Sequence, residues 1–310
     1  MRPVVTRFAP SPTGRLHLGH AYSALLGHRF AREAGGCFLL RIEDIDPGRT
    51  REEHVAGIIE DLSWLGIDWD GAVVRQSARL PLYAEALERL KARGLVYPCF
   101  CTRSDIAAEI AASASAPHGP DGPLYPGTCR RLPEAEREER MVREPHAWRL
   151  DMQTALATLL PGESRGPDRT PQLDPGFRRG TLAWTDSGLG EVVAEPDRFG
   201  DVVLARKDAP TSYHLAVTVD DAAQSVTDIV RGRDLFAATD IHRLLQELLG
   251  LPVPRYHHHA LLADESGRRL AKRNGARSIA DMRAAGADPA RLAADLVEGR
   301  LPAGFTAAAL

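Results

Sequence analysis

Two histidines near the start of the chain, His17 and His20, follow a turn that could bind an anion. A short strand-like segment is interrupted by the run Pro10-Ser11-Pro12-Thr13-Gly14, and apolar residues at helical spacing follow it. Such a helix presents backbone N–H groups and the positive end of its dipole to a ligand. Histidines three residues apart can face the same group, and Gly19 between them would let a flat base approach the backbone. The spacing predicts an anion site, although two histidines alone would equally fit an ordinary βα turn.

The longer run around these residues is Arg7-Phe8-Ala9-Pro10-Ser11-Pro12-Thr13-Gly14-Arg15-Leu16-His17-Leu18-Gly19-His20. It closely resembles the HIGH signature of class I aminoacyl-tRNA synthetases, in the form used by the glutamyl group. The resemblance implies an α/β fold, the Rossmann-like nucleotide-binding fold of this class, with catalytic residues at His17 and His20. It also implies that ATP, accompanied by Mg²⁺, binds at His17, Gly19 and His20.

The expected amino acid, L-glutamate, presents an ammonium and two carboxylates. Its site therefore needs one acidic group and at least two cationic or hydroxyl donors. That set is supplied by Arg7, Glu43, Tyr213 and Arg231. The resemblance implies that Arg7 and Tyr213 bind the side-chain carboxylate, while Glu43 binds the ammonium and Arg231 the α-carboxylate. Which arginine takes which carboxylate stays open. The predicted substrate site also includes Phe8, Ala9, Pro10 and Ser11.

A basic run late in the chain contains one of its few lysines. The sequence has only Lys91, Lys207 and Lys272, and Lys272 lies in Gly267-Arg268-Arg269-Leu270-Ala271-Lys272-Arg273-Asn274. This run resembles the KMSKS loop, whose lysine neutralises the charge moving from ATP to pyrophosphate. Arg269 and Ala271 depart from the motif. A solvated basic loop is the alternative, but lysine is rare here, and its presence at the motif position favours a catalytic Lys272.

Three cysteines could bind a metal. Cys99 and Cys101 precede a loop and Cys129 follows it, so their thiolates can hold zinc with one further ligand. The resemblance implies Tyr125 as that ligand, whereas His118 is the more conventional candidate. We expect one structural Zn²⁺ per chain; three thiols without metal are the alternative. Cys37 stands alone and is expected in the core.

Strand and helix alternate in the first half of the chain. Strands are expected at 38–42, 201–206 and 213–219, helices at 54–65, 81–93 and 240–249, a flexible excursion at 107–123 and a loop at 160–180. The pattern predicts a catalytic domain whose two halves, 1–96 and 191–250, are separated by an insertion. That insertion, 97–190, contains the zinc region, and residues 251–310 supply the KMSKS-like loop and a short helical tail.

The composition of the chain limits the kinds of partner that it could bind. With 310 residues, 44% of them hydrophobic, the chain can bury a sizeable core, and its net charge of −3 means that RNA must meet a local basic patch. No apolar run approaches membrane-spanning length, and no signal peptide precedes the first strand. Four cysteines at this size do not form a disulfide framework. We therefore expect a cytoplasmic protein, a monomer without a membrane partner.

The length of the tail separates branches of the family. A full glutamyl-tRNA synthetase carries a large anticodon-binding region after the KMSKS-like loop, whereas here 276–310 suffice for a helix or two. The chain is thus similar to the truncated paralogues, which place glutamate on the queuosine base in the anticodon stem-loop of tRNA(Asp). Readers of RNA sequence generally bind such unstacked loop bases. A compact glutamyl-tRNA synthetase charging a 3′ end, or a non-catalytic RNA-binding paralogue, are the alternatives.

Overall fold

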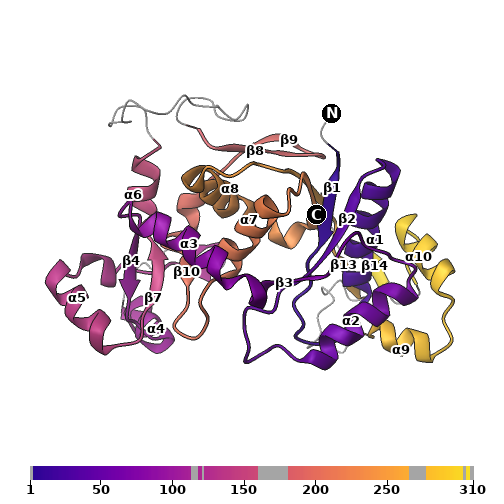
Figure 1. Ribbon diagram of the computed structural model, residues 1–310, viewed down its shortest axis with the longest axis horizontal. Coiled ribbons are helices and arrows are strands. Elements are labelled where there is room, and N and C mark those ends of the chain that lie inside the picture. Colours follow the sequence, from indigo (N-terminus) through magenta and orange to yellow (C-terminus); the bar gives the residue numbers. More distant parts are fainter. Residues whose placement is uncertain are drawn as a thin grey trace.

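The computed structural model describes residues 3–112, 118–120, 122–159, 181–264, 277–302 and 305–307. Its centre is a largely parallel sheet in two parts (Figure 1). The first part has the order β1-β2-β3, all parallel, and the second has the order β11-β12-β8-β9, in which β9 is antiparallel. The two parts meet where the Thr227 N–H donates to the Val5 carbonyl at 2.9 Å. Parallel strands therefore end side by side, which is how this fold class builds ligand sites.

The strands are β1 (Val5–Phe8), β2 (Cys37–Ile42), β3 (Val74–Arg75), β4 (Val96–Cys99), β5 (His118–Gly119), β6 (Gly122–Pro123), β7 (Ala147–Leu150), β8 (Ala183–Asp186), β9 (Gly190–Val193), β10 (Val203–Ala205), β11 (Asp228–Gly232), β12 (Arg255–His259), β13 (Leu262–Asp264) and β14 (Phe305–Ala307). The α-helices are α1 (Leu18–Glu33), α2 (Glu52–Trp64), α3 (Leu80–Lys91), α4 (Arg103–Ala112), α5 (Glu134–Arg143), α6 (Met152–Ala157), α7 (Tyr213–Ala223), α8 (Ala238–Leu249), α9 (Ile279–Ala284) and α10 (Pro289–Val297). The short 3₁₀ helices are η1 (Gln76–Arg79), η2 (Cys129–Arg131), η3 (Pro196–Phe199) and η4 (Arg233–Leu235). Within the described ranges, every helix is too short or too polar to cross a bilayer.

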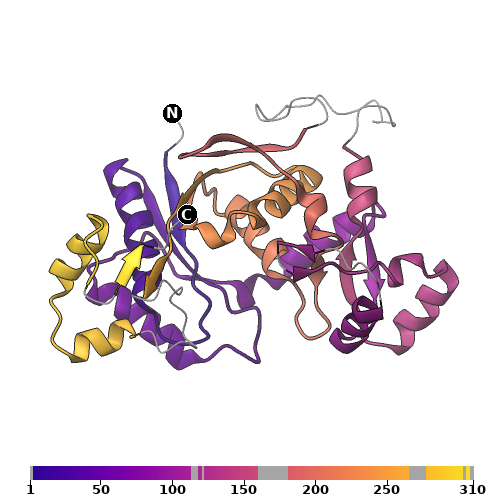
Figure 2. The same ribbon diagram turned by 180° about the vertical axis from the view of Figure 1, so that it is seen from behind.

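A second sheet, of order β10-β7-β4 and antiparallel throughout, lies with α4 and α5 at one end of the molecule, and α9 and α10 lie at the other (Figures 1 and 2). Strand pairing does not follow chain order here. β8 joins the parallel sheet although it lies inside the expected insertion, while β10 pairs with β7 although it lies beyond it. The division of the chain into the expected units therefore remains a proposal.

The C-terminal tail packs on the first half of the chain. Ile279 of α9 and Leu296 of α10 are fully buried in the same apolar cluster as Leu18 and Leu62. A strand, β14, also pairs antiparallel with β13, which the expectation of a purely helical tail did not include. The tail is thus part of the core around α1 and α2.

The segment 213–219, expected as a strand, is the first part of helix α7. Leu215, Ala216 and Val217 are all buried, and a helix buried on most of its surface gives the same continuous apolar run as a buried strand. The helix is started by Ser212, whose hydroxyl accepts from the Leu215 N–H at 3.4 Å. The prediction of a strand at 213–219 is therefore wrong, because the apolar run belongs to a buried helix.

Two other local expectations were wrong. Residues 107–112, expected as flexible, are the end of α4, which begins with a reciprocal cap between Thr102 and Asp105. The rest of that stretch lies partly outside the described residues. The expected loop at 160–180 lies entirely outside them. Cys37, expected in the core, is exposed because it is the first residue of β2, directly after the turn at Gly35.

Candidate active site

A cavity of about 1170 Å³ lies beyond the carboxyl ends of β1 and β11, at the N-terminus of α1. Its wall includes every residue predicted to be catalytic or to bind glutamate or ATP, except Lys272. These residues are Arg7, Phe8, Ala9, Pro10, Ser11, His17, Gly19, His20, Glu43, Tyr213 and Arg231. The two arginines come from strands more than 200 residues apart, which the topology makes neighbours.

The N-terminus of α1 is capped by two histidine side chains. Nδ1 of His17 accepts from the Gly19 N–H at 3.1 Å, and Nδ1 of His20 accepts from the His17 N–H at 3.2 Å. Their rings stack with centroids 3.7 Å apart. Because each Nδ1 accepts, the proton of each neutral ring is on Nε2, which is a donor. At the predicted anion site, two of the backbone N–H groups are thus already bonded to imidazole nitrogens.

Gly19 has a structural role at the start of α1, while its expected role in admitting a flat base remains a prediction. A Cβ added there would lie 3.1 Å from Cε1 of His17, closer than side chains normally approach. The missing side chain therefore makes room for the His17 ring, which can then cap the helix.

A buried ion network lies behind Arg7, which lines the cavity; we call the network of Arg7, Arg41 and Asp221 the floor. Arg7 donates to Asp221 from Nε at 3.1 Å and from Nη2 at 3.4 Å, and Arg41 Nη2 lies 2.8 Å from the same carboxylate. All three side chains are at most 6% exposed. Burial would raise the pKa of Asp221, but the two guanidinium groups outweigh it and hold that pKa below its usual value. Asp221 thus fixes the orientation of both arginines.

Glu43 lies beside this network, and its side chain forms no hydrogen bond within the described residues. Its nearest cation is Arg41, at 3.8 Å from Nη2 to Oε1, and its side chain is 8% exposed. Burial raises the pKa of Glu43 to about 7, against the opposing effect of Arg41 and Arg7. Burial likewise raises the pKa of Tyr213 to about 12, so its hydroxyl stays a donor at neutral pH. Glu43 is therefore a carboxylate that a bound cation would stabilise.

Arg231 reaches the cavity from β11 and is 4% exposed. Its Nε donates to His258 at 3.2 Å, Nη1 bonds to His242 at 3.3 Å, and Nη2 donates to Thr239 at 2.6 Å and to the Leu235 carbonyl at 3.2 Å. Among the described residues, no carboxylate forms an ion pair with it. Arg231 is therefore a buried cation held by uncharged groups.

Lys272, with Arg269 and Ala271, lies in 265–276, outside the described residues. The chain re-enters the described part beside the α1 cap. Ser278 forms a β-bridge with His17, and the Ile279 N–H donates to the Leu16 carbonyl at 2.9 Å. The described chain that follows 265–276 thus begins next to the first histidine of the site.

A second cavity, of about 680 Å³, shares wall residues with the first, among them Ser11, Glu43 and Tyr213. Its far wall includes Tyr125 and Arg149, which belong to the region of the second sheet. The Arg149 guanidinium lies over the Tyr125 ring, 3.9 Å from its centroid. The two cavities therefore connect the nucleotide-binding half with the cysteine cluster.

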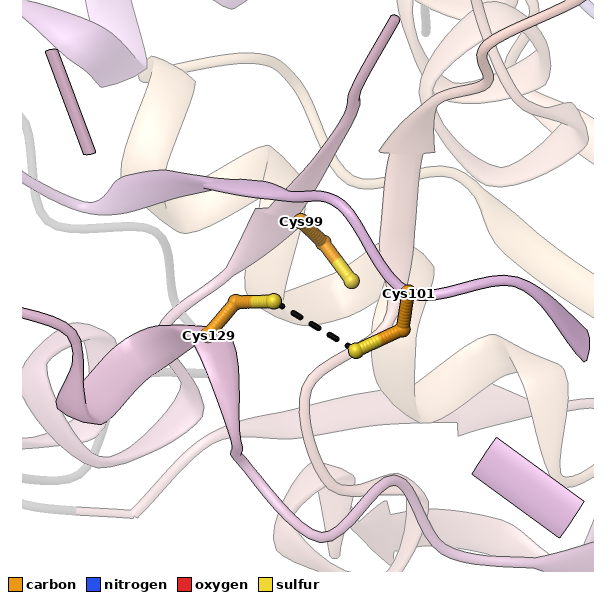
Figure 3. Close-up of side chains that lie close together, drawn as sticks. All are labelled: Cys99, Cys101 and Cys129. Atoms are coloured by element: carbon orange, nitrogen blue, oxygen red, sulfur yellow. Dashed lines mark hydrogen bonds between the residues drawn. The ribbon is translucent and has the colours of Figure 1, made fainter. Parts of the chain in front are cut away.

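The cysteine cluster lies where β4 meets η2 (Figure 3). The three Sγ atoms lie within 4.8 Å of one another, and those of Cys101 and Cys129 are 3.4 Å apart. The Tyr125 hydroxyl is 3.5 Å from Sγ of both Cys99 and Cys101 and accepts from the Cys129 N–H at 2.9 Å. Zinc–sulfur bonds of about 2.3 Å in a tetrahedron place sulfurs about 3.8 Å apart, so this donor set fits zinc. The side chain of His118 lies outside the described ones.

Some residues of the site were missed from the sequence. Arg41 carried a signal, because a charged residue inside the buried run 38–42 needs a buried partner. Asp221 follows an apolar run, after Asp220, and is buried as well. Thr239 and His242 are three residues apart and share a helix face, but nothing in the sequence linked them to Arg231.

Comparisons with known proteins place the chain in a family. The model described as "tRNA synthetases class I (E and Q), catalytic domain" matches residues 3–159 and 177–308. The chain is 52% identical over 290 residues to a glutamyl-Q tRNA(Asp) synthetase of Rhodobacter capsulatus, covering 93% of this chain and 97% of that protein. It is 38% identical over 295 residues to a glutamate–tRNA ligase of Aquifex aeolicus, covering 94% of this chain but 56% of that protein.

A solved structure agrees in fold. The glutamate tRNA ligase of Elizabethkingia meningosepticum, in complex with its amino acid, matches with a TM-score of 0.74 and 26% identity. The match covers 96% of this chain and 60% of that one. The chain belongs to the class I aminoacyl-tRNA synthetases of the glutamyl and glutaminyl group.

Proposed function

We propose that this enzyme activates L-glutamate with ATP and transfers it from glutamyl-adenylate to the queuosine base in the anticodon of tRNA(Asp). The observation that carries the activation step is the larger cavity, in which one acidic group, two arginines and a tyrosine hydroxyl surround a space beside the histidine-capped helix. The choice of acceptor is supported by sequence identity. The chain is 52% identical to a relative named glutamyl-Q tRNA(Asp) synthetase and 38% identical to one named glutamate–tRNA ligase.

In this proposal the charges of the cavity match those of glutamate. Glu43 binds the ammonium, and Arg231 binds the α-carboxylate because its charge is not neutralised by a protein carboxylate. Arg7 and Tyr213 bind the side-chain carboxylate, with Arg7 held in place by Asp221. A charge-assisted hydrogen bond to each end of the substrate would select glutamate over shorter or neutral amino acids.

ATP binds where His17, Gly19 and His20 begin α1, with Mg²⁺ on its phosphates. The Nε2–H groups of the histidines donate to phosphate oxygens, and Lys272 neutralises the charge that develops on pyrophosphate. The attachment of Ser278 beside His17 supports this placement of the loop. We expect Lys272→Ala to slow glutamate-dependent pyrophosphate exchange by roughly 10²–10³-fold, as loss of a transition-state donor does. Unchanged exchange would remove the lysine from the mechanism.

Transfer needs little further catalysis, because the adenylate is a mixed anhydride that a correctly placed hydroxyl can attack. Queuosine carries hydroxyls on its cyclopentene ring, and a loop base is turned out more easily than a base in a duplex. The smaller cavity adjoins the glutamate site at Tyr213 and offers room for that base. The anticodon stem-loop thus enters where another synthetase would admit an acceptor end.

The test of the acceptor uses radiolabelled glutamate with three RNAs. We expect label on queuosine-containing tRNA(Asp), recovered on the modified nucleoside after nuclease digestion, and none on the unmodified tRNA(Asp) transcript. Charging of tRNA(Glu) at its 3′ end would instead identify a compact glutamyl-tRNA synthetase. Adenylate formation without transfer to any of the three would leave activation intact and reject the proposed acceptor.

Zinc is proposed as a structural group held by Cys99, Cys101, Cys129 and Tyr125. When bound, it would crosslink β4 to η2 and so close the segment between them. The Tyr125 hydroxyl lies 3.5 Å from Sγ of both Cys99 and Cys101, which supports tyrosine as the fourth ligand. Metal analysis should find about one zinc per chain in the purified protein.

The remaining proposals concern organisation. We infer a cytoplasmic monomer, because the supply of ATP and tRNA is cytoplasmic and all the residues assigned to the site come from one chain. We also propose that 1–96 and 191–250 are the two halves of the catalytic domain. In this proposal 97–190 is the insertion, and 251–310 contains the KMSKS-like loop and the tail. Size-exclusion chromatography with light scattering tests the monomer, since a dimer would elute at twice the 33.8 kDa mass.

A further inference from the structure

Arg231 is held by four hydrogen bonds whose acceptors are two imidazoles, a hydroxyl and a carbonyl. A guanidinium has five N–H donors, so at least one on Nη1 remains for a ligand. A buried arginine is ordinarily paired with a carboxylate, since an unpaired buried charge is costly. The absence of such a partner in the described part of the chain therefore needs an explanation.

The imidazoles that bond to Arg231 are fixed in the tautomers that accept. The Asp186 carboxylate accepts a hydrogen bond from Nδ1–H of His258 at 2.8 Å, so Nε2 of His258 is left to accept from Arg231. His242 accepts at Nδ1 and therefore has its proton on Nε2, which donates to Nδ1 of His214 at 3.2 Å. Each ring is thus oriented by a second partner on its far side.

Both rings also stay uncharged. Burial, and then the nearby Arg231 guanidinium, lower the pKa of His258 to about 4, in spite of its Asp186 partner. Burial and Arg231 hold the pKa of His242 well below its usual value. The acceptors around Arg231 are neutral across the physiological range, so the charge of the guanidinium is not compensated by them.

We propose that Thr239, His242 and His258 are positioning residues that fix Arg231 through neutral acceptors and so leave its positive charge for the carboxylate of the substrate. This inference rests on the proposed function, which places that carboxylate in the larger cavity. Thr239 and His242 lie on one face of α8, and His258 lies on β12 next to β11. A helix and a strand thus clamp the guanidinium from two directions.

The charge of the groups that hold Arg231 distinguishes two roles for them. If the acceptors served stability alone, a carboxylate in their place would hold Arg231 at least as well. If neutrality matters, a carboxylate there neutralises Arg231 and competes with the substrate. Isosteric pairs separate the two cases, because glutamine and glutamate, or asparagine and aspartate, differ in charge but hardly in shape.

The experiment compares His242→Gln with His242→Glu, and Thr239→Asn with Thr239→Asp, in the full-length enzyme. The readouts are KM for glutamate and for ATP in pyrophosphate exchange, and the melting temperature. We expect the acidic member of each pair to have a glutamate KM at least about tenfold above its neutral partner, with the KM for ATP alike in both. The melting temperature of the acidic member should be equal or higher.

Gln246→Glu is the matched control. Gln246 is buried on the same face of α8, one turn beyond His242, and donates to the Tyr256 hydroxyl rather than contacting Arg231. A carboxylate there should not raise the glutamate KM. Equal glutamate KM values within both isosteric pairs would overturn the inference, as would an equal rise in the control. A wild-type enzyme that does not activate glutamate would instead reject the proposed function.

Discussion

Two arginines face the same cavity but are held in opposite ways. Arg7, on β1, forms an ion pair with Asp221 on the cavity floor, where Arg41 shares the same carboxylate. Arg231, on β11, is bonded to neutral groups alone within the described residues. Both are almost fully buried. The difference shows that burial of a cation does not by itself reveal its role; the charge of its partners does.

The floor contributes shape, because its arginines are paired with a protein carboxylate. Arg231 contributes charge to the cavity wall, because in the proposed function a ligand would balance it. A substrate carboxylate near Arg231 would relieve a cost that folding leaves in place, whereas near Arg7 it must share a guanidinium with Asp221. This comparison predicts that substitutions on the floor change stability first and that substitutions on the wall change substrate binding first.

The largest effect is expected for Asp221→Asn. It leaves Arg7 and Arg41 buried without their shared carboxylate, which should lower the free energy of unfolding by about 3–5 kcal/mol. Urea denaturation followed by fluorescence measures it. The control Asp208→Asn removes an exposed partner of Arg206 and should change that free energy by less than about 1 kcal/mol. Similar losses in both variants would contradict the role assigned to the floor.

Arg231→Gln should show the reverse pattern. Loss of the uncompensated charge is expected to lower kcat/KM for glutamate roughly a hundredfold, by the penalty typical of a lost charged partner, while the protein remains folded. Pyrophosphate exchange and a thermal melt measure the two effects. Arg255→Gln, which removes an arginine with an exposed side chain from β12, is the control and should leave kcat/KM unchanged. A melting temperature that falls as far as that of Asp221→Asn would erase the distinction between wall and floor.

The sequence predicted the residues that line the cavity better than the residues that hold them in place. Arg7, Glu43, Tyr213 and Arg231 were each expected in the site, because their positions match motifs and their charges match glutamate. The residues that hold them were not expected. Asp221 acts through a pairing between segments 214 residues apart, and His242 through a helix face turned toward a strand. Such contacts follow from tertiary packing, which no local pattern encodes.

Secondary structure was likewise predicted correctly in some segments and wrongly in others. The helices expected at 54–65 and 81–93 and the strand expected at 38–42 correspond to α2, α3 and β2, because their apolar residues indicate these elements clearly. Helix α7 was mistaken for a strand, since burial on most of its surface removed the periodicity that distinguishes the two. The error did not affect the site, because Tyr213 lies at the first position of that helix and faces the cavity.

A smaller effect is expected from pH, through Glu43. Its carboxylate must be ionised to bind an ammonium, and burial raises its pKa to about 7. The kcat/KM for glutamate should therefore fall up to about tenfold per pH unit below pH 7, while the KM for ATP stays level. His258, with its pKa lowered to about 4, stays neutral through this range. A flat profile between pH 6 and 8 would show that Glu43 does not control binding.

The same shift has an opposite consequence for stability. Because the folded-state pKa lies above the ordinary 4.5, the ionised carboxylate costs stability, and this cost grows as pH rises from about 4.5 to about 7. Glu43→Gln should therefore raise the melting temperature at pH 8 and change it little at pH 4.5, while it abolishes glutamate activation. A lower melting temperature at pH 8 would mean that the carboxylate stabilises the fold.

The smallest effect on glutamate is expected from the cysteine cluster, because none of Cys99, Cys101 and Cys129 lines the larger cavity. The triple Cys→Ser variant should lose its zinc, yet keep the KM for glutamate and ATP within about twofold in exchange assays without RNA. Its KM for tRNA should rise, because the ring of Tyr125 forms part of the wall of the smaller cavity and would lose its anchor. Cys37→Ser, at an exposed cysteine far along the chain from the cluster, is the control for removing a thiol. Zinc retained in the triple variant would place the ligands elsewhere. A tenfold rise in the glutamate KM would instead show that the cluster supports the wall or the floor directly, and the two regions would no longer be independent of it.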